Sequence, residues 1–338
     1  MVLFTFASKL NIMKRLLFTA LAAFFVFSAT LFAQNADTLK KISVEKVYKR
    51  MLHKNPNNVV ANIGLAQLCF EKSDYNAATD YSRIALDAGA DTIAEVWLLY
   101  SKSLDGAGRT EMAIKQCKKA LQHFPEHAYL WAEYGFLNFK FRDYDAAITA
   151  NEKSLTIQPL NSDACLVYSL SLYERSNHPQ AALPILFALL IDNRKAIMPR
   201  NSWLFMQMAK QKHTSIPIPY YAKRLAMIEP MQITPFMYPE KPFAISLESF
   251  DEADFRLTAD VYIQNIKEDT NSQVLNKMLQ TISNLKKEGH QNTALNVILR
   301  YNENKTVTDW LKIHSEEIRK YALWLDKNLP QATPNANH

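Results

Sequence analysis

The stretch WAEYGFLNFKFRDYDAAITANEKSLTIQP, residues 131–159, decides the fold of this 338-residue chain. It contains two apolar helical patterns separated by a polar turn, and it ends in a proline, which cannot continue a helix. Similar residue types recur about 34 residues earlier and about 34 residues later, which is the signature of a structural repeat. The matching positions are Trp131, Tyr134, Gly135, Asn138, Tyr144, Ala147, Asn151, Ser154, Leu155 and Pro159 in the central copy, Trp97, Tyr100, Ser101, Leu104, Thr110, Ala113, Cys117, Ala120, Leu121 and Pro125 in the preceding copy, and Cys165, Tyr168, Ser169, Leu172, His178, Ala181, Ile185, Ala188 and Leu189 in the following copy.

Small residues recur at the places where two helices of a repeat must approach closely. An earlier, weaker copy adds two more of them, so that each half of the repeat has its own series. The first-helix series is Ala66, Ser101, Gly135 and Ser169, and the second-helix series is Ala78, Ala113, Ala147 and Ala181. Neither helix of such a unit can bury its apolar stripe alone, so the units must stack. We therefore expect all of these small residues to be buried.

This pattern resembles the tetratricopeptide repeat, whose Trp, Leu-Gly, Tyr, Ala, Phe and Pro positions recur every ~34 residues. The resemblance implies an all-α fold: a right-handed solenoid of helical hairpins, with additional helices at the C-terminus. We assign the solenoid to residues 38–230, with repeats at 59–93, 94–127, 128–161 and 162–195 and a degenerate unit at 196–230, which carries Trp203, Met206, Tyr221, Leu225 and Pro230. Since solenoid units contact only their neighbours, residues 38–230 are expected to fold alone.

The rest of the chain is less regular. Residues 231–250 are rich in proline and aromatic residues and indicate an extended connection. Residues 251–327 indicate a C-terminal helical region, with helices expected near 251–268, 273–288, 291–301 and 307–327. The pair 273–288 and 291–301 has Gly289 between its helices and is a candidate for one more repeat. Residues 328–338 are polar and are expected to form a disordered tail.

The N-terminus resembles a targeting signal. Lys14 and Arg15 precede an apolar run from Leu16 to Phe32, and Ala33 offers a small-residue cleavage point, which is typical of a secretory signal peptide covering residues 1–33. The alternative is an uncleaved membrane anchor, since the run approaches the ~20 residues that a span needs. We expect an exported protein that is periplasmic or associated with the cell envelope, and a membrane contact only if the signal stays uncleaved.

The net charge and the cysteine content argue against a nucleic-acid partner and against a disulfide framework. Cleavage after Ala33 would remove Lys9, Lys14 and Arg15 and no acidic residue, so the net charge of +6 would become +3. No dense Lys/Arg run remains, which disfavours a nucleic-acid partner. Three cysteines cannot all pair within the chain, and each lies in an apolar helical pattern, so no disulfide framework is expected.

The sequence contains no motif that would justify naming a catalytic, metal-binding or cofactor-binding residue. His-Glu-x-x-His, Gly-x-Ser-x-Gly and Cys-x-x-Cys are all missing. His123 and His127 are four residues apart, but Pro125 lies between them, so they cannot share a helix face. We therefore expect no enzyme and no cofactor.

What the resemblance implies instead is a partner-binding groove lined by the first helices of successive repeats. The best candidates at the matching positions are Phe70, Tyr129, Phe136, Phe139, Lys140, Leu170 and Tyr173, with Glu71, Lys102, Asp105 and Glu174 beside them. Aromatic side chains on such a face suit a protein or peptide partner, although Phe136 and Phe139 could instead pack between helices. The Lys/Asn clamp by which some family members hold a C-terminal carboxylate is missing, because its slots hold Leu99, Glu133 and Val167.

The sequence therefore predicts an exported scaffold or adaptor that binds a protein or peptide on its concave surface. An alternative of another class stays open, in which residues 231–338 form an enzymatic or ligand-binding domain carried on the repeats. A pocket with converging polar groups in that region would favour the alternative, and a smooth continuation of the solenoid would favour the scaffold.

Overall fold

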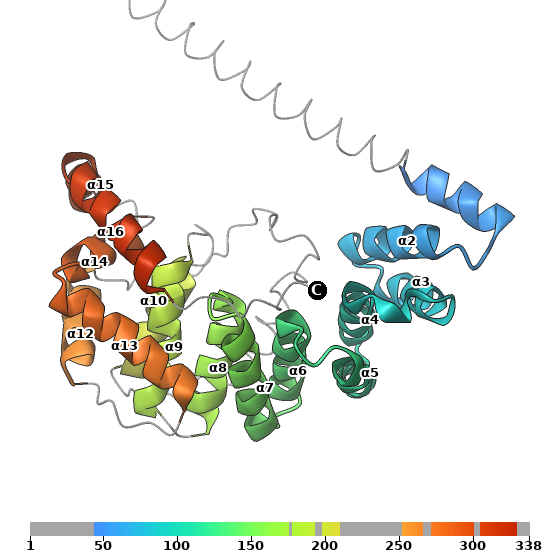
Figure 1. The fold of residues 1–338 in the computed structure, drawn as a ribbon, viewed down its shortest axis with the longest axis horizontal. Coiled ribbons are helices and arrows are strands. Elements are labelled where there is room, and N and C mark those ends of the chain that lie inside the picture. The colour runs from blue at the N-terminus through green and yellow to red at the C-terminus, as the bar shows by residue number, and fades with distance from the viewer. Residues whose placement is uncertain are drawn as a thin grey trace, which may run out of the picture.

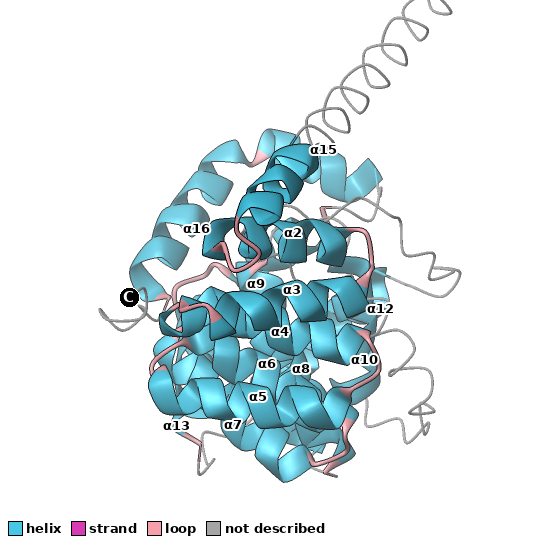
Figure 2. Ribbon diagram, turned by 90° about the vertical axis from the view of Figure 1, so that its right-hand side faces the viewer, coloured by secondary structure: helices cyan, strands magenta, loops and turns pink. Residues whose placement is uncertain are grey.

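A computed structural model describes residues 44–175, 178–192, 198–209, 252–265, 272–300 and 305–329. Throughout these ranges the chain forms helices, turns and loops, and none of them contains a β-strand (Figure 2). Four of the predicted segments lie wholly or largely outside the described residues. They are the signal peptide at 1–33, the second half of the degenerate unit with Tyr221, Leu225 and Pro230, the connection at 231–250, and the tail beyond residue 329.

Four helical hairpins follow the residues 44–54, which themselves form a helix. We call their first members the inner helices: α2 (Val59–Glu71), α4 (Ala94–Gly106), α6 (Ala128–Lys140) and α8 (Ser162–Glu174). Their second members are the outer helices: α3 (Tyr75–Asp87), α5 (Thr110–His123), α7 (Tyr144–Ile157) and α9 (His178–Ile191). Figure 1 shows the hairpins in a curved row, with each inner helix on the hollow side, and each inner helix contacts the next one. This confirms the all-α helical-hairpin solenoid predicted from the repeat.

The turn inside the hairpins is set by local chemistry. Ser73, Gly108 and Arg142 occupy the left-handed backbone region at equivalent places, with φ of 62°, 77° and 66°. The next residue in each case donates its N–H to a carbonyl five residues back, which is the bond of a Schellman motif: Asp74 to Cys69 (2.9 Å), Arg109 to Leu104 (2.8 Å) and Asp143 to Asn138 (2.9 Å). The inner helix therefore ends and the chain reverses in the same way in three repeats.

The small residues lie where the sequence predicted. All of those named above are buried, and an added Cβ on Gly135 would lie 2.3 Å from Nδ2 of Asn151 on α7. No side chain fits at such a distance unless the neighbour moves. Glycine at residue 135 therefore lets α6 and α7 pack closely.

Beyond α9, several of the described helices do not extend the row of hairpins. The helices of this part of the chain are α10 (Met198–Ala209), α12 (Glu252–Asn265), α13 (Gln273–Lys287), α14 (Gln291–Leu299), α15 (Lys305–Ile313) and α16 (Ser315–Asn328). Helix α10 packs on α9 and α12 packs on α10, whereas α13 lies across the outer helices α9 and α7 (Figure 1). Gly289 (φ 78°) and the bond from His290 N–H to the Leu285 carbonyl (2.9 Å) repeat the hairpin turn. However, α13 and α14 do not pack along each other, so the suggestion of one more repeat there was wrong.

The helix expected at 307–327 is in fact two helices that meet at His314. The His314 imidazole stacks on the Trp310 indole with ring centroids 4.1 Å apart, and its Nδ1 lies 2.8 Å from the Trp310 carbonyl oxygen. His314 precedes Glu316 and Glu317 in the first turn of α16, where acidic side chains favour a helix start. A new helix therefore begins after His314, although the apolar pattern continues through it.

One hydrophobic core joins the last two repeats to the C-terminal helices. It runs from Ala132 on α6 to Trp324 on α16 and includes Phe205 on α10, which packs edge-on against Phe255 on α12 at 5.7 Å. A polar contact reinforces it: the buried Tyr168 hydroxyl donates to Oε1 of Glu152 (2.5 Å) and lies 3.2 Å from Oγ of Ser272, the N-cap of α13. The first two repeats are packed by two smaller clusters, one of which also includes Leu130 and Leu137 of α6. The three cysteines are free, as expected.

Candidate partner-binding face

The inner helices carry the seven side chains that the sequence singled out. Three of them remain accessible, all on α6: Tyr129 is 42% exposed, and Phe136 and Lys140 are partly exposed. Lys140 Nζ lies 5.6 Å from the centre of the Phe136 ring, within reach of a cation–π interaction. Helix α6 thus presents two aromatic rings and a cation at its accessible surface.

The other four candidates are buried, namely Phe70, Phe139, Leu170 and Tyr173. Phe70 packs edge-on against Tyr75 at 5.6 Å, and Phe139 lies 5.8 Å from Tyr144, each within its own hairpin. These contacts place both rings in the core between an inner and an outer helix. A contact between any of the seven residues and a partner stays a prediction.

A charged contact ties the inner helices α4 and α6 together beside the accessible side chains. Lys140 Nζ lies 2.6 Å from both carboxylate oxygens of Asp105, and Oγ1 of Thr110 donates to Asp105 Oδ1 at 2.7 Å. The Lys140 and Asp105 side chains are only 19% and 11% exposed, so water screens this pair less than a surface salt bridge. The contact therefore fixes the distance between two successive repeats.

A second pair of opposite charges lies deeper in the same layer. Lys102 on α4 is 7% exposed and Glu133 on α6 is 4% exposed. Burial lowers the pKa of Lys102, while the nearby carboxylates of Glu133 and Asp163 raise it. Burial also raises the pKa of Glu133 to about 7, against the opposing effect of the Lys102 charge. Burial thus favours the uncharged form of both side chains.

Sequence reasoning named Lys102 and Asp105 as neighbours of the groove but assigned no role to Glu133 or Asp163. The sequence does contain one signal for the Asp105–Lys140 pair: the two residues are 35 positions apart, which is about one repeat. Opposite charges one repeat apart on first helices should face each other in a solenoid. Nothing in the sequence, however, shows that they are buried.

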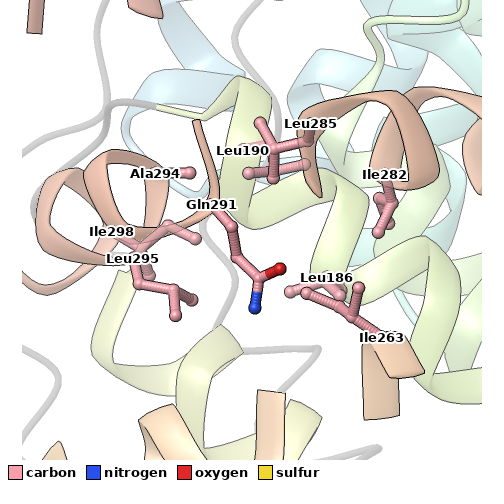
Figure 3. Close-up of a pocket in the computed structure, with 9 residues that line it drawn as sticks. All are labelled: Leu186, Leu190, Ile263, Ile282, Leu285, Gln291, Ala294, Leu295 and Ile298. Carbon is pink, nitrogen blue, oxygen red and sulfur yellow. The ribbon is translucent and has the colours of Figure 1, made fainter. Parts of the chain in front are cut away.

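A small cavity between the described helices α9, α12, α13 and α14 offers no chemical site (Figure 3). Eight of the nine lining residues are apolar, and the exception, Gln291, donates its side-chain N–H to Asp260. The space is about 10 Å³, room for at most one water molecule. Over the described ranges, no group of three or more His, Cys, Asp or Glu side chains could hold a metal ion. None of the helices in those ranges is long and apolar enough to span a membrane.

No protein-family model and no curated protein matches the chain. Several solved structures share its helical architecture. MamA is 21% identical over 39% of this chain and 77% of its own, with a TM-score of 0.37. The pilF protein of Pseudomonas aeruginosa is 13% identical over 84% of this chain and 99% of its own, with a TM-score of 0.40. A chain of the APC/C hetero-tetramer Cut9–Hcn1 is 12% identical over 80% of this chain and 46% of its own, with a TM-score of 0.45. Because the sequence identities and TM-scores are this low, the fold assignment rests on the hairpins themselves. They have the arrangement of a tetratricopeptide-like solenoid.

Proposed function

We propose that this protein is a non-enzymatic scaffold that binds a protein or peptide partner on the face formed by its inner helices. The observation that carries this proposal is the surface of the inner helix α6, where Tyr129, Phe136 and Lys140 remain accessible. Aromatic side chains, tyrosine among them, are typical anchors at the centre of a protein interface. Among the described helices of the C-terminal region, the cavity between α9, α12, α13 and α14 is small and mostly apolar and does not favour the enzymatic alternative.

Tyr129→Ala tests this face. Because the ring is 42% exposed, its loss should change the free energy of unfolding by no more than roughly 0.5 kcal/mol. Partner affinity should fall by about 2 kcal/mol if the ring is an anchor. The measurement is the retention of cell-envelope proteins on the immobilised mature chain, with a thermal melt of each variant.

Phe141→Ala is the matched control, because Phe141 is 54% exposed but follows α6 in the turn to α7. Its loss should leave both the melt and partner retention unchanged. If Tyr129→Ala and the unaltered chain retain the partner equally, the inner face at this position is not the binding surface.

We further propose that the protein is exported and acts in the periplasm or cell envelope, with residues 1–33 removed as a signal peptide. The basic pair Lys14 and Arg15, the apolar run after it, and Ala33 support this proposal. Intact-mass analysis of the envelope fraction should then find a chain that begins near Gln34. A full-length, membrane-embedded species as the only form would instead identify the segment as an anchor.

A further inference from the structure

The second residue of each inner helix lies at the same position in four successive repeats. These residues are Val60 of α2, Glu95 of α4, Tyr129 of α6 and Asp163 of α8. The first three reach solvent: Val60 is 62% exposed, the Glu95 side chain 54% and Tyr129 42%. Because each inner helix contacts the next one, these side chains form a row across the starts of the inner helices, which we call the helix-start row.

The carboxylate of Glu95 carries a negative charge that no neighbour cancels. Among the described residues, the only basic group paired with it is the His127 imidazole, whose Nε2 lies 3.7 Å from Oε1 of Glu95. His127 is the N-cap of α6, and its Nδ1 accepts a hydrogen bond from the Leu130 N–H at 3.2 Å. A ring nitrogen that accepts such a bond carries no proton, so the imidazole is neutral while it caps the helix. Burial also lowers the pKa of His127, and Glu95 therefore keeps its full charge.

The same imidazole also contacts Tyr129. The two rings meet edge to face, with their centroids 6.1 Å apart. His127 thus brings together a carboxylate of one repeat and an exposed aromatic ring of the next. Both attract a cation: the carboxylate by its charge and its hydrogen-bond acceptors, and the face of the ring by its quadrupole. An acidic side chain of a partner would be repelled at the same place.

We propose that the helix-start row binds a basic segment of the partner, in which an Arg or Lys side chain lies over the Tyr129 ring and pairs with Glu95. This inference rests on the proposed function, because it gives the partner class for the same inner helices. Val60 adds exposed apolar surface to the row in the first repeat. Asp163 acts on the buried Lys102 and has further interactions within the chain, so the site is assigned without it.

The attraction must be local, because the chain as a whole is basic. Its net charge of +6 repels a basic peptide at long range. A test must therefore remove the Glu95 charge and compare the result with the loss of an equal charge elsewhere. Glu111→Gln provides this control, since Glu111 is exposed in the first turn of the outer helix α5. Glu95 likewise lies in the first turn of α4, so both variants remove an acidic side chain from a helix start.

The experiment selects binding peptides from a random peptide library on the purified chain at low salt. We expect the selected peptides to be enriched in Arg and Lys and depleted in Asp and Glu. The affinity of the tightest selected peptide is then measured by fluorescence anisotropy. Glu95→Gln should weaken it roughly 2- to 5-fold, as expected for an ion pair at the surface, and the difference should vanish at high salt. Glu111→Gln should bind the peptide as tightly as the unaltered chain.

Two substitutions of Tyr129 separate a cation–π contact from a simple apolar contact. Tyr129→Phe keeps the ring and should keep the affinity. Tyr129→Leu keeps an apolar side chain without the ring and should weaken binding roughly 2- to 5-fold. Because Tyr129 is 42% exposed, both variants should melt like the unaltered chain, so that a loss of affinity reports on the contact itself.

The outcomes distinguish this inference from the proposed function. Selected peptides may depend on Tyr129, in that Tyr129→Ala weakens them, and yet carry no excess of Arg or Lys, or bind Glu95→Gln or Tyr129→Leu as tightly as the unaltered chain. Any of these results would leave the inner helices as the binding face and overturn the basic partner. If no selected peptide depends on Tyr129, the proposed function fails at this face and the basic segment fails with it.

Discussion

A fragment of residues 38–230 should keep its first two hairpins folded but lose the native packing of α8, α9 and α10. Its C-terminal end would expose the part of the core that α12, α13 and α14 cover in the full chain, including Phe205, Leu186 and Leu190. Each such side chain contributes about 1.5–3 kcal/mol when buried, so the loss of several removes a large share of the ~5–15 kcal/mol that stabilises a domain. This is the opposite of the behaviour that the repeat pattern alone predicts.

Hydrogen exchange resolved by segment is the measurement. Amides of α2 to α5 should stay protected in the fragment, because their cores are separate from the large one and solenoid units depend on their neighbours. Amides of α8 to α10 should exchange rapidly. Equal protection of α8 to α10 in the fragment and in the full chain would show that the C-terminal helices are dispensable for the fold.

A pair of point variants on α12 checks the same core without truncation. Phe255→Ala removes a ring with no exposed surface that packs on Phe205, and should lower the free energy of unfolding by about 3–5 kcal/mol. Leu257→Ala, two residues away and 63% exposed, should change it by no more than roughly 0.5 kcal/mol. The contrast separates the core contact from a general effect on α12.

Phe139→Ala is the second substitution with a large expected effect. The ring is 7% exposed, packs against Tyr144 and belongs to the large core, so its loss should cost about 3–5 kcal/mol of stability. Phe141→Ala, on the neighbouring turn and 54% exposed, is the matched control and should melt like the unaltered chain. Chemical denaturation of the two variants is the measurement. If the free energy of unfolding of Phe139→Ala lies within ~0.5 kcal/mol of that of the unaltered chain, the ring is not in the core and becomes a candidate for partner binding again.

The repeats could be predicted from the sequence because their signals are local. The 34-residue period marks one hairpin after another. The small residues at helix contacts and the prolines after the outer helices each act within one hairpin. Gly135 shows why such a signal is dependable, since Asn151 lies where its Cβ would be and no other residue fits without a shift. The turn at Gly108 is equally local, because its φ of 77° favours glycine.

The candidate site was less predictable than the fold. The sequence placed all seven residues on the inner helices, but burial divided them, since Phe139 packs inward while Phe136 on the same helix stays partly exposed. The periodic pattern cannot make that distinction, because an aromatic residue suits a core and a groove equally well. The burial of Glu133 beside Lys102 was also invisible in the sequence, since it depends on how separate helices pack together.

The sequence by itself determined that the chain has helical hairpins, where each hairpin turns, and which small residues allow their helices to meet. Those features depend on residues close together along the chain, whose spacing is fixed by the helix period. Only the tertiary structure decided that α13 turns back across α9 and α7, that the Tyr168 hydroxyl lies beside Ser272, 104 residues further on, and that Glu133 is buried near Lys102, Asp105 and Lys140. Contacts of this kind follow from the packing of the whole array, because burial and charge balance depend on every helix that reaches a site, whatever its distance along the chain.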